Sequence, residues 1–450
     1  MIRTVITSIA IFLLIASAGR AQQAGTPDTG SELKELTLER ALNIAETNNY
    51  EVQKAQKETE IQKYKYRKTN ALFLPSITLE EQASTTTDPL NAFGFKLKRE
   101  EISQADFNPL LLNDPDRTDL FSTRLTVEQP LINVDGFYER NAMSHQRKAA
   151  DKKLTRTRHY TRFQVKKTYY RLLLLRERIH VLDSALIAAK AHRDQARDYM
   201  EQGMVNRADY LEARVRVLNL ESDRSEAQNN YSKTEQNLRY MLGMDGDTEL
   251  KPVDSLKVES TPQKPTNYAR INSNRSDMQA IEHKIEASEA MLNSSKSQFL
   301  PSINVMGQYE FNDDTPFGTG AENYMVGASL KWNLFNGFKN IASWQESKQK
   351  MEKARIARRQ QAARNKVQIN DAYQSILHAQ TSIEKSRASV EQAKENLRIR
   401  KDRYDQGMEN TTDLLSAEVK LQEAKVRKLK ALYAYNVNLA QLELMLEKEL

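Results

Sequence analysis

The chain of 450 residues contains no cysteine, and it has only 14 glycines and 11 prolines. The absence of cysteine excludes disulfides and a lipid-modified N-terminal cysteine. Few glycines and prolines leave room for long helices, because these two residues are the usual helix breakers. After the first 21 residues no apolar run reaches 18 residues, so we expect no membrane-spanning helix in the mature chain. Any membrane contact must then be made by strands or by a surface.

Motifs that carry chemistry are also missing. The sequence has no nucleophile elbow, Walker motif or dinucleotide fingerprint. Its 67 basic and 60 acidic side chains are interspersed, which is typical of a solvated helix surface and not of a nucleic-acid site. The six histidines form no i,i+4 pair that would indicate a metal site: they are His145, His159, His180, His192, His283 and His378. We therefore predict no enzyme, no metal, no cofactor and no nucleic-acid partner.

The N-terminus has the pattern of a secretory signal peptide over residues 1–21. Arg3 gives a short basic start, an apolar stretch follows from about Val5 to Ala18, and small residues precede the mature chain. Cleavage is expected after Ala21, with Ala18 as the second choice. An uncleaved anchor is the alternative, although the apolar stretch is shorter than the roughly 20 residues of a spanning helix. Residues 22–35 would form an N-terminal tail.

The pentapeptide FLPSI occurs twice, at residues 73–77 and 299–303. The same order of helical stretch, two alternating stretches, Asn/Gly turn and very long helical stretch surrounds both copies. We interpret this as a tandem duplication with repeats at 36–243 and 267–450. The stretch 244–266, rich in Pro, Asp, Ser and Lys, reads as a linker or equatorial region.

Each repeat is expected to begin with a helix that leads into two strands and two further helices. The first repeat is predicted to have strands at about 76–87 and 119–130 and helices at 136–202 and 207–242. The second is predicted to have strands at about 302–311 and 323–332 and helices at 337–406 and 411–448. Apolar residues recur at alternating steps of three and four in the long helices, which favours coiled-coil packing over a globular core.

Pro75 and Pro301 lie inside the two FLPSI copies and mark a switch from helix to strand, because proline cannot continue a helix. The strands that follow alternate between apolar and polar residues, a pattern typical of outer-membrane barrel strands with lipid outside and water inside. A soluble sheet packed on a helix layer is the alternative. Four strands cannot close a barrel. Two copies would give a filled barrel of eight strands, and three would give twelve strands around an open lumen.

These features together resemble the TolC-like outer-membrane efflux proteins of Gram-negative bacteria. The resemblance covers about Leu36 to Leu450, and its specificity lies in the order of motifs repeated twice. It implies a homotrimer with a twelve-stranded barrel in outer-membrane lipid, continuous with a periplasmic α-helical coiled-coil barrel. It also implies that the trimer meets a periplasmic adaptor (membrane-fusion) protein and an inner-membrane transporter, as the passive exit duct of a tripartite efflux or type I secretion system.

The resemblance further implies that the helix-hairpin tips dock the adaptor and close the channel. The tip residues are Gly203, Met204 and Asp209 in the first repeat and Tyr404, Gly407 and Met408 in the second. Asp413 would form a ring of three carboxylates at a channel constriction. Asp209 and Asp413 could equally serve only to favour the N-terminus of the next helix. The sequence departs from the family where Ser416 replaces a second acid and where Glu409 replaces a basic residue.

A soluble periplasmic coiled-coil scaffold or adaptor remains the competing hypothesis from another class of protein. The polar stretch 88–118, between the first two strands, is expected to be an extracellular loop that either folds over the mouth or packs down. The sequence contains no indication of the cargo.

Overall fold

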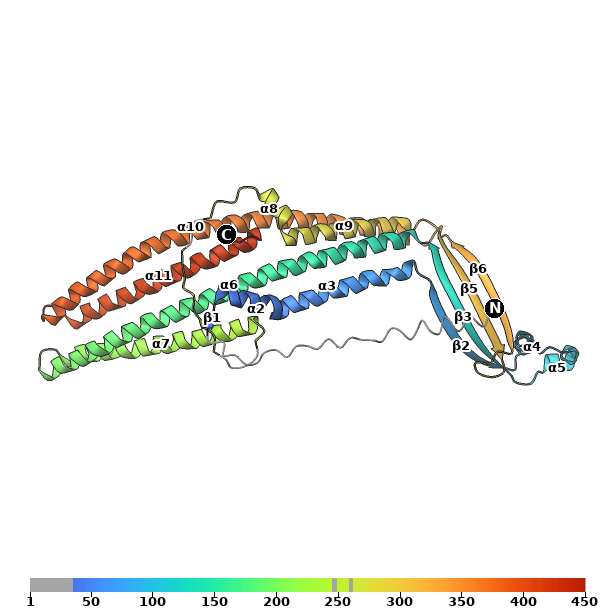
Figure 1. Ribbon diagram of the computed structural model, residues 1–450, viewed down its shortest axis with the longest axis horizontal. Helices are drawn as coiled ribbons and strands as arrows, with labels where there is room; N and C mark the ends of the chain where they lie inside the picture. The colour runs from blue at the N-terminus through green and yellow to red at the C-terminus, as the bar shows by residue number, and fades with distance from the viewer. Residues whose placement is uncertain (1–34, 245–248, 259–261, 450) are drawn as a thin grey trace.

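We describe the protein from a computed structural model that places residues 35–244, 249–258 and 262–449. The predicted signal peptide at 1–21 and the tail up to residue 34 lie outside the described residues. The molecule is long and narrow, with helices over most of its length and a four-stranded sheet near one end (Figure 1).

The two halves contain the same main elements in the same order. The first half consists of β1 (Glu35–Leu36), α2 (Leu38–Asn48), α3 (Tyr50–Lys68), η1 (Thr69–Leu72), β2 (Ser76–Thr86), α4 (Pro89–Lys98), η2 (Gln104–Phe107), α5 (Pro109–Asn113), β3 (Thr118–Ile132), α6 (Val134–Glu201) and α7 (Arg207–Met241). The second half consists of β4 (Lys251–Pro252), α8 (Tyr268–Asn274), α9 (Ser276–Ser297), β5 (Ser302–Asp313), β6 (Ala321–Lys331), α10 (Lys339–Asp405) and α11 (Thr411–Leu446). The strands of the larger sheet and the four longest helices begin and end within two residues of the expected positions.

The helix expected before each FLPSI copy is divided into two helices. In the first half the break is at Asn49, whose backbone is extended and whose side chain accepts hydrogen bonds from the N–H groups of Glu51 and Val52 at the start of α3. In the second half the break is at Arg275, also extended, between α8 and α9. An asparagine at a helix N-cap is a common stop-and-restart signal, whereas an arginine is not.

The larger sheet is antiparallel, with strand order β2-β3-β5-β6. Residues on one face follow continuous rows across it, such as Leu79, Leu125, Tyr309 and Tyr324. Pro75 and Pro301 each lie one residue before a strand, β2 and β5 respectively. Because β2 and β6 are the edges of this sheet, each presents unpaired backbone groups on its outer side.

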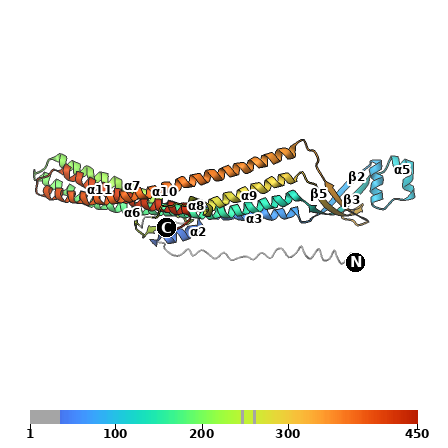
Figure 2. The same cartoon turned by 90° about the horizontal axis from the view of Figure 1, so that it is seen from above.

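Two helix hairpins, α6–α7 and α10–α11, extend away from the sheet, and their tips lie at the opposite end of the molecule in both views (Figure 2). Helix α6 has 68 residues and α10 has 67. Each helix is therefore about 100 Å long at about 1.5 Å per residue.

Apolar packing is distributed along the helices in separate clusters. One cluster joins α2, α6 and α7 around Tyr169 and Leu172. A second joins α10 and α11 around Ile376 and Tyr435, and a third lies farther along α6 and α7 around Leu182. Many of the buried positions are alanine, which lets neighbouring helices approach closely.

Candidate functional site

One face of the larger sheet is apolar and uncovered. Five of its side chains are between 63% and 77% exposed: Ile77, Leu79, Tyr324, Val326 and Leu330. They belong to strands β2 and β6, and the strand pairing places them on the same face as Leu125 and Tyr309 of the central strands. A contiguous apolar surface of this kind indicates contact with lipid or with another protein.

The opposite face of the sheet is polar. Glu310 of β5 is 5% exposed and lies 3.4 Å from the guanidinium of Arg124, its neighbour on β3. One step along the strands, the Ser122 hydroxyl donates to the side-chain oxygen of Asn312 at 2.6 Å. Charged and amide groups arranged in rows on one face favour contact with water on that side of the sheet.

The stretch 88–118, expected as a loop, folds into short helices, of which α4 lies against the polar face. The Lys98 ammonium at the end of α4 is 3.4 Å from the carboxylate of Glu310. Next to it, the Arg99 guanidinium donates to the backbone carbonyl of Asp119 at 2.9 Å. Ala92 of α4 is fully buried. These contacts place α4 over the polar face at the end of the sheet farthest from the helix hairpins (Figure 1).

The rest of this stretch has its own internal packing. The rings of Phe93 and Phe107 meet edge to face, with 5.8 Å between their centroids. The Lys96 ammonium is 2.9 Å from the Asp106 carboxylate. The hydrogen bond from Lys96 and those from Ser103 lower the pKa of Asp106 to about 2. The segment therefore consists of short helices that pack against one another, and it is not an extended loop.

The two hairpin tips turn at the predicted glycines. Gly203 and Gly407 have φ values of +74° and +70°, a left-handed conformation that side chains with a Cβ rarely adopt. Asn206 and Asp209 form a capping box at the start of α7. At the start of α11, the side chain of Asn410 accepts a hydrogen bond from the N–H of Asp413 at 2.7 Å. Asp209 therefore caps the start of α7.

The structure brings the predicted tip residues of both halves into one groove. Met204, Asp209, Tyr404 and Gly407 all line this groove. Tyr404 is only 5% exposed, and its ring lies 6.4 Å from that of Tyr199 on the other hairpin. Met204 and Met408 are exposed at the tips.

Glu409, which stands where the family resemblance implied a basic residue, forms ion pairs with two arginines of α10. Its carboxylate lies 2.7 Å from the Arg400 guanidinium and 3.3 Å from that of Arg403. The same Arg400 group is 3.5 Å from the carboxylate of Asp413. The positive charge at this tip is thus supplied from α10 and not from the turn, and no sequence pattern indicated this arrangement.

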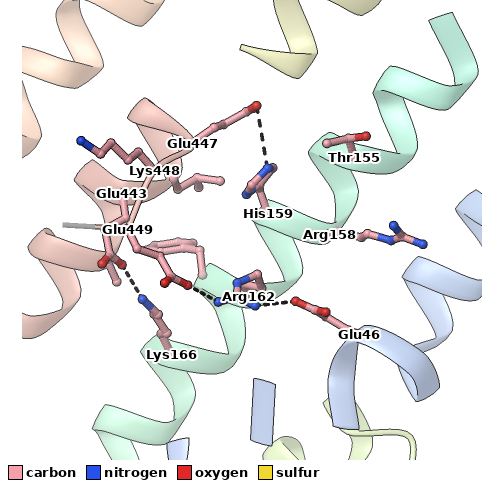
Figure 3. Close-up of a pocket in the computed structure, with 13 residues that line it drawn as sticks. Glu46, Thr155, Arg158, His159, Arg162, Lys166, Glu443, Glu447, Lys448 and Glu449 are labelled. Carbon is pink, nitrogen blue, oxygen red and sulfur yellow. Dashed lines mark hydrogen bonds and ion pairs between the residues drawn. The ribbon is translucent and has the colours of Figure 1, made fainter. Parts of the chain in front are cut away.

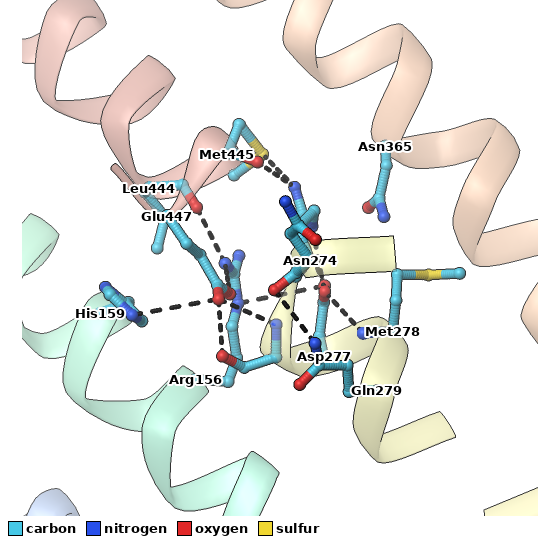
Figure 4. Close-up of polar contacts among 12 residues, drawn as sticks. Arg156, His159, Asn274, Asp277, Met278, Gln279, Asn365, Leu444, Met445 and Glu447 are labelled. Carbon is cyan, nitrogen blue, oxygen red and sulfur yellow. Dashed lines mark hydrogen bonds and ion pairs between the residues drawn. The ribbon is translucent and has the colours of Figure 1, made fainter. Parts of the chain in front are cut away.

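A buried network of charges joins the end of α11 to the start of α9, about midway along the molecule. Arg275 is 1% exposed, and its guanidinium donates to both carboxylate oxygens of Asp277 at 3.0 and 2.6 Å and to the backbone carbonyl of Met445 at 2.9 Å. Glu447 accepts hydrogen bonds from the N–H and the hydroxyl of Ser276 at 2.8 and 2.6 Å. Figure 4 shows Asp277 and Glu447 converging with Arg156 of α6.

Burial alone would raise the pKa of Asp277, but the hydrogen bond from Arg275 and the charges of Arg275 and Arg156 outweigh burial and lower it. Nothing in the sequence indicated this network, because its partners are about 170 residues apart.

A pocket beside this network lies between α2, α6 and the end of α11 (Figure 3). Arg162 makes ion pairs with Glu46 and Glu449, and the Lys166 ammonium is 2.5 Å from Glu443. His159 faces the same pocket, 3.9 Å from Glu447. Burial lowers the pKa of His159, the charges of Arg156 and Arg162 act in the same direction, and Glu447 and Glu46 oppose them.

We expect stability to fall as the pH drops below about 6.5, the ordinary pKa of histidine. Because His159 has a lowered pKa in the folded state, the unfolded chain binds the proton first, and proton binding to the unfolded chain favours unfolding. Above pH 6.5 both states are neutral at this position and the effect vanishes. Thermal melts of the wild type and of His159→Gln between pH 7.5 and about pH 5 measure it. The variant should lose part of the pH dependence; identical slopes would show that His159 has no such role.

Among the residues that the structure describes, no helix combines the length and hydrophobicity needed to cross a membrane. The same residues include one group of side chains arranged so that they could hold a metal ion: His145, His283 and Glu286.

Comparison with known proteins identifies relatives along most of the chain. A family model described as "outer membrane efflux protein" matches residues 41–244 and 267–447. The outer membrane protein TolC of Vibrio cholerae is 23% identical over an alignment of 343 residues, and the match covers 73% of this chain and 77% of the relative.

Two solved structures have the same fold. The outer membrane channel CmeC of Campylobacter jejuni superposes with a TM-score of 0.79 at 17% identity, covering 91% of this chain and 85% of that one. A membrane protein from Pseudomonas aeruginosa gives a TM-score of 0.78, also at 17% identity, covering 91% and 93% of the two chains.

Proposed function

This chain belongs to the outer membrane efflux protein family, and from that premise we propose that three copies of it form one passive exit duct across the outer membrane and the periplasm. As a member of this family it is an outer-membrane efflux channel that extends into the periplasm. The family consists of channel-forming proteins and not of enzymes. Membership favours the duct over the soluble periplasmic scaffold.

The observation that carries the proposal is the open four-stranded sheet with one exposed apolar face. In lipid, every backbone N–H and C=O group needs a partner within the protein, so the edges β2 and β6 must be paired. Pairing β2 of one copy with β6 of the next satisfies both edges. Three copies of four strands make a closed barrel of twelve strands, which is wide enough for an aqueous lumen. The apolar face would contact lipid and the polar face would line the lumen.

The helices would continue the wall into the periplasm as an α-helical barrel. Helices α3, α6, α9 and α10 run on from the four strands (Figure 1). Each of the three copies would therefore form one third of the helical wall, as it would form one third of the β-barrel. The two repeats, 36–243 and 267–450, would form equivalent halves of each copy's wall. The segment 244–266 would join them near the middle of the molecule.

The hairpin tips would dock a periplasmic adaptor protein, which links the duct to an inner-membrane transporter that supplies the energy. The groove between the tips, the exposed Met204 and Met408 and the turns at Gly203 and Gly407 support this role. The groove contains side chains of both hairpins, so the binding of a partner there would depend on the distance between the two hairpins.

Asp413 would form the constriction as a ring of three carboxylates. It is exposed near the tip of α11, and such a ring favours cations and repels anions. The neighbouring Arg400 guanidinium at 3.5 Å would offset part of that negative charge. We therefore expect the ring to be weaker in this protein than an unpaired ring of the same size.

Disulfide cross-linking tests the pairing of β2 with β6 between copies. Because the sequence has no cysteine, only the introduced cysteines can form disulfides. Thr78 of β2 and the β6 residues Gly327, Ser329 and Lys331 lie on the polar face. Cysteine at position 78 combined with cysteine at one of these three positions should give covalent dimers and trimers on oxidation.

The control pairs the Thr78→Cys substitution with Leu330→Cys, whose side chain lies on the opposite face of β6. This pair and each single variant should yield far less cross-linked trimer. If every pair across the two edges stays monomeric while the protein is folded, the closed trimer is wrong.

A further inference from the structure

Two histidines from different helices meet at one carboxylate in the wall between the sheet and the middle of the molecule. The Nδ1 atom of His145, on α6, is 2.7 Å from a carboxylate oxygen of Glu286 on α9. The Nδ1 atom of His283, also on α9, is 2.6 Å from the same oxygen. The two imidazole rings are 6.1 Å apart between centroids.

The arrangement follows from helix geometry. His283 and Glu286 are three residues apart, so both side chains lie on the same face of α9. His145 is contributed by α6, the helix that packs along α9. It lies 11 residues after the start of α6 at Val134, so the cluster is about 16 Å from the sheet end of that helix at about 1.5 Å per residue.

We propose that His145, His283 and Glu286 bind a divalent transition-metal ion, with zinc as the best-fitting occupant. The three ligand atoms lie within 4.8 Å of one another. Two imidazole nitrogens and one carboxylate oxygen are a common zinc donor set, with metal–ligand distances of about 2.0–2.2 Å. Calcium and magnesium prefer oxygen ligands throughout. A fourth, open position would be filled by water.

The cluster is partly exposed to solution, although the Nδ1 atom of His145 is itself buried. The side chains of His145, His283 and Glu286 are 19%, 23% and 41% exposed. The ligand atoms are slightly closer than a bound ion requires, so binding needs only a small outward movement of three side chains. The adjacent Lys284 points about 100° away from His283 around the helix, into a separate groove that it lines with Lys153.

Such a site would clamp α6 to α9. These helices run from the strands toward the middle of the molecule. Without a metal ion, His145 of α6 already lies within ion-pair distance of Glu286 on α9, whereas the hydrogen bond between His283 and Glu286 lies within α9. A metal ion would link the two helices by coordination bonds and stabilise the folded state according to its affinity and concentration. The inference is independent of the proposed duct, because it concerns two helices of one copy.

The test is zinc titration of the purified full-length protein in detergent, freed of any affinity tag and treated with a chelator. Isothermal titration calorimetry should show one zinc ion per chain. His145→Gln and His283→Gln, which keep a hydrogen-bonding group but are poor ligands, should each weaken binding by at least about tenfold. Cobalt bound to the wild type should give the visible absorption of a tetrahedral site, which both variants should lose.

His378→Ala is the matched control, since His378 lies on α10 away from this cluster, and it should bind zinc as the wild type does. Equal circular dichroism spectra of all variants would show that the fold is intact. Absence of saturable zinc binding, or binding that is unchanged in both glutamine variants, would overturn the proposal.

Discussion

Replacing Asp277 by alanine should destabilise the protein by about 3–5 kcal/mol per chain, the usual cost of breaking a buried ion pair from one side. The substitution leaves the guanidinium of Arg275, which is 1% exposed, without its carboxylate. Arginine cannot lose its charge in a protein, so the cost cannot be avoided by deprotonation. The remaining hydrogen bond to the Met445 carbonyl offsets only part of it.

Thermal denaturation followed by circular dichroism at one fixed heating rate measures the effect. Glu51→Ala is the matched control, because Glu51 is also an acid in the first turn of a helix but makes its ion pair with Lys54 at the surface. It should cost no more than about 1 kcal/mol.

The double variant Arg275→Met/Asp277→Ala removes both charges, so it should be more stable than Asp277→Ala alone. If Asp277→Ala melts like Glu51→Ala, the network does not fasten α9 to the end of α11.

The second large effect is expected on the apolar face of the sheet. Val326→Arg would place a charge against lipid near the middle of β6, at a cost of about 2–4 kcal/mol in each copy. Its neighbour Met325 lies on the polar face, in the same row as Gln308. Met325→Arg should therefore be tolerated, because water in the lumen can solvate the charge.

The measurement is the amount of protein extracted as trimer from outer membranes. Val326→Arg should reduce it severely, and Met325→Arg should leave it near the wild-type amount while shifting the channel toward anions. The reverse order would mean that the two faces of the sheet have been assigned the wrong way round, and equal yields would mean that neither face contacts lipid selectively.

Local patterns explain why the strands and long helices were predictable. Proline in each FLPSI copy ends a helix, and the alternation that follows determines which residues share a face of the sheet. The break at Asn49 was readable in principle, since asparagine is a good N-cap. The short helices in 88–118 carried a comparable signal: Asp88–Pro89 and Asn108–Pro109 each place a capping residue before a proline at the first helical position.

What the sequence could not predict depends on residues far apart in the chain. Arg275 meets Met445, and His145 meets His283, only because the helices pack side by side. A search for closely spaced histidines cannot find a site divided between two helices. The pairing of Glu409 with Arg400 spans only nine residues, but it depends on the turn that folds Glu409 back against α10.

The most direct test of the account is the ion conductance of the purified trimer in planar lipid bilayers. We predict discrete conductance steps from a channel that is selective for cations, and we expect Asp413→Ala to reduce that selectivity. A correctly folded trimer that conducts no ions, either as wild type, as Asp413→Ala or with an adaptor protein present, would contradict a shared aqueous pore built from four strands per copy.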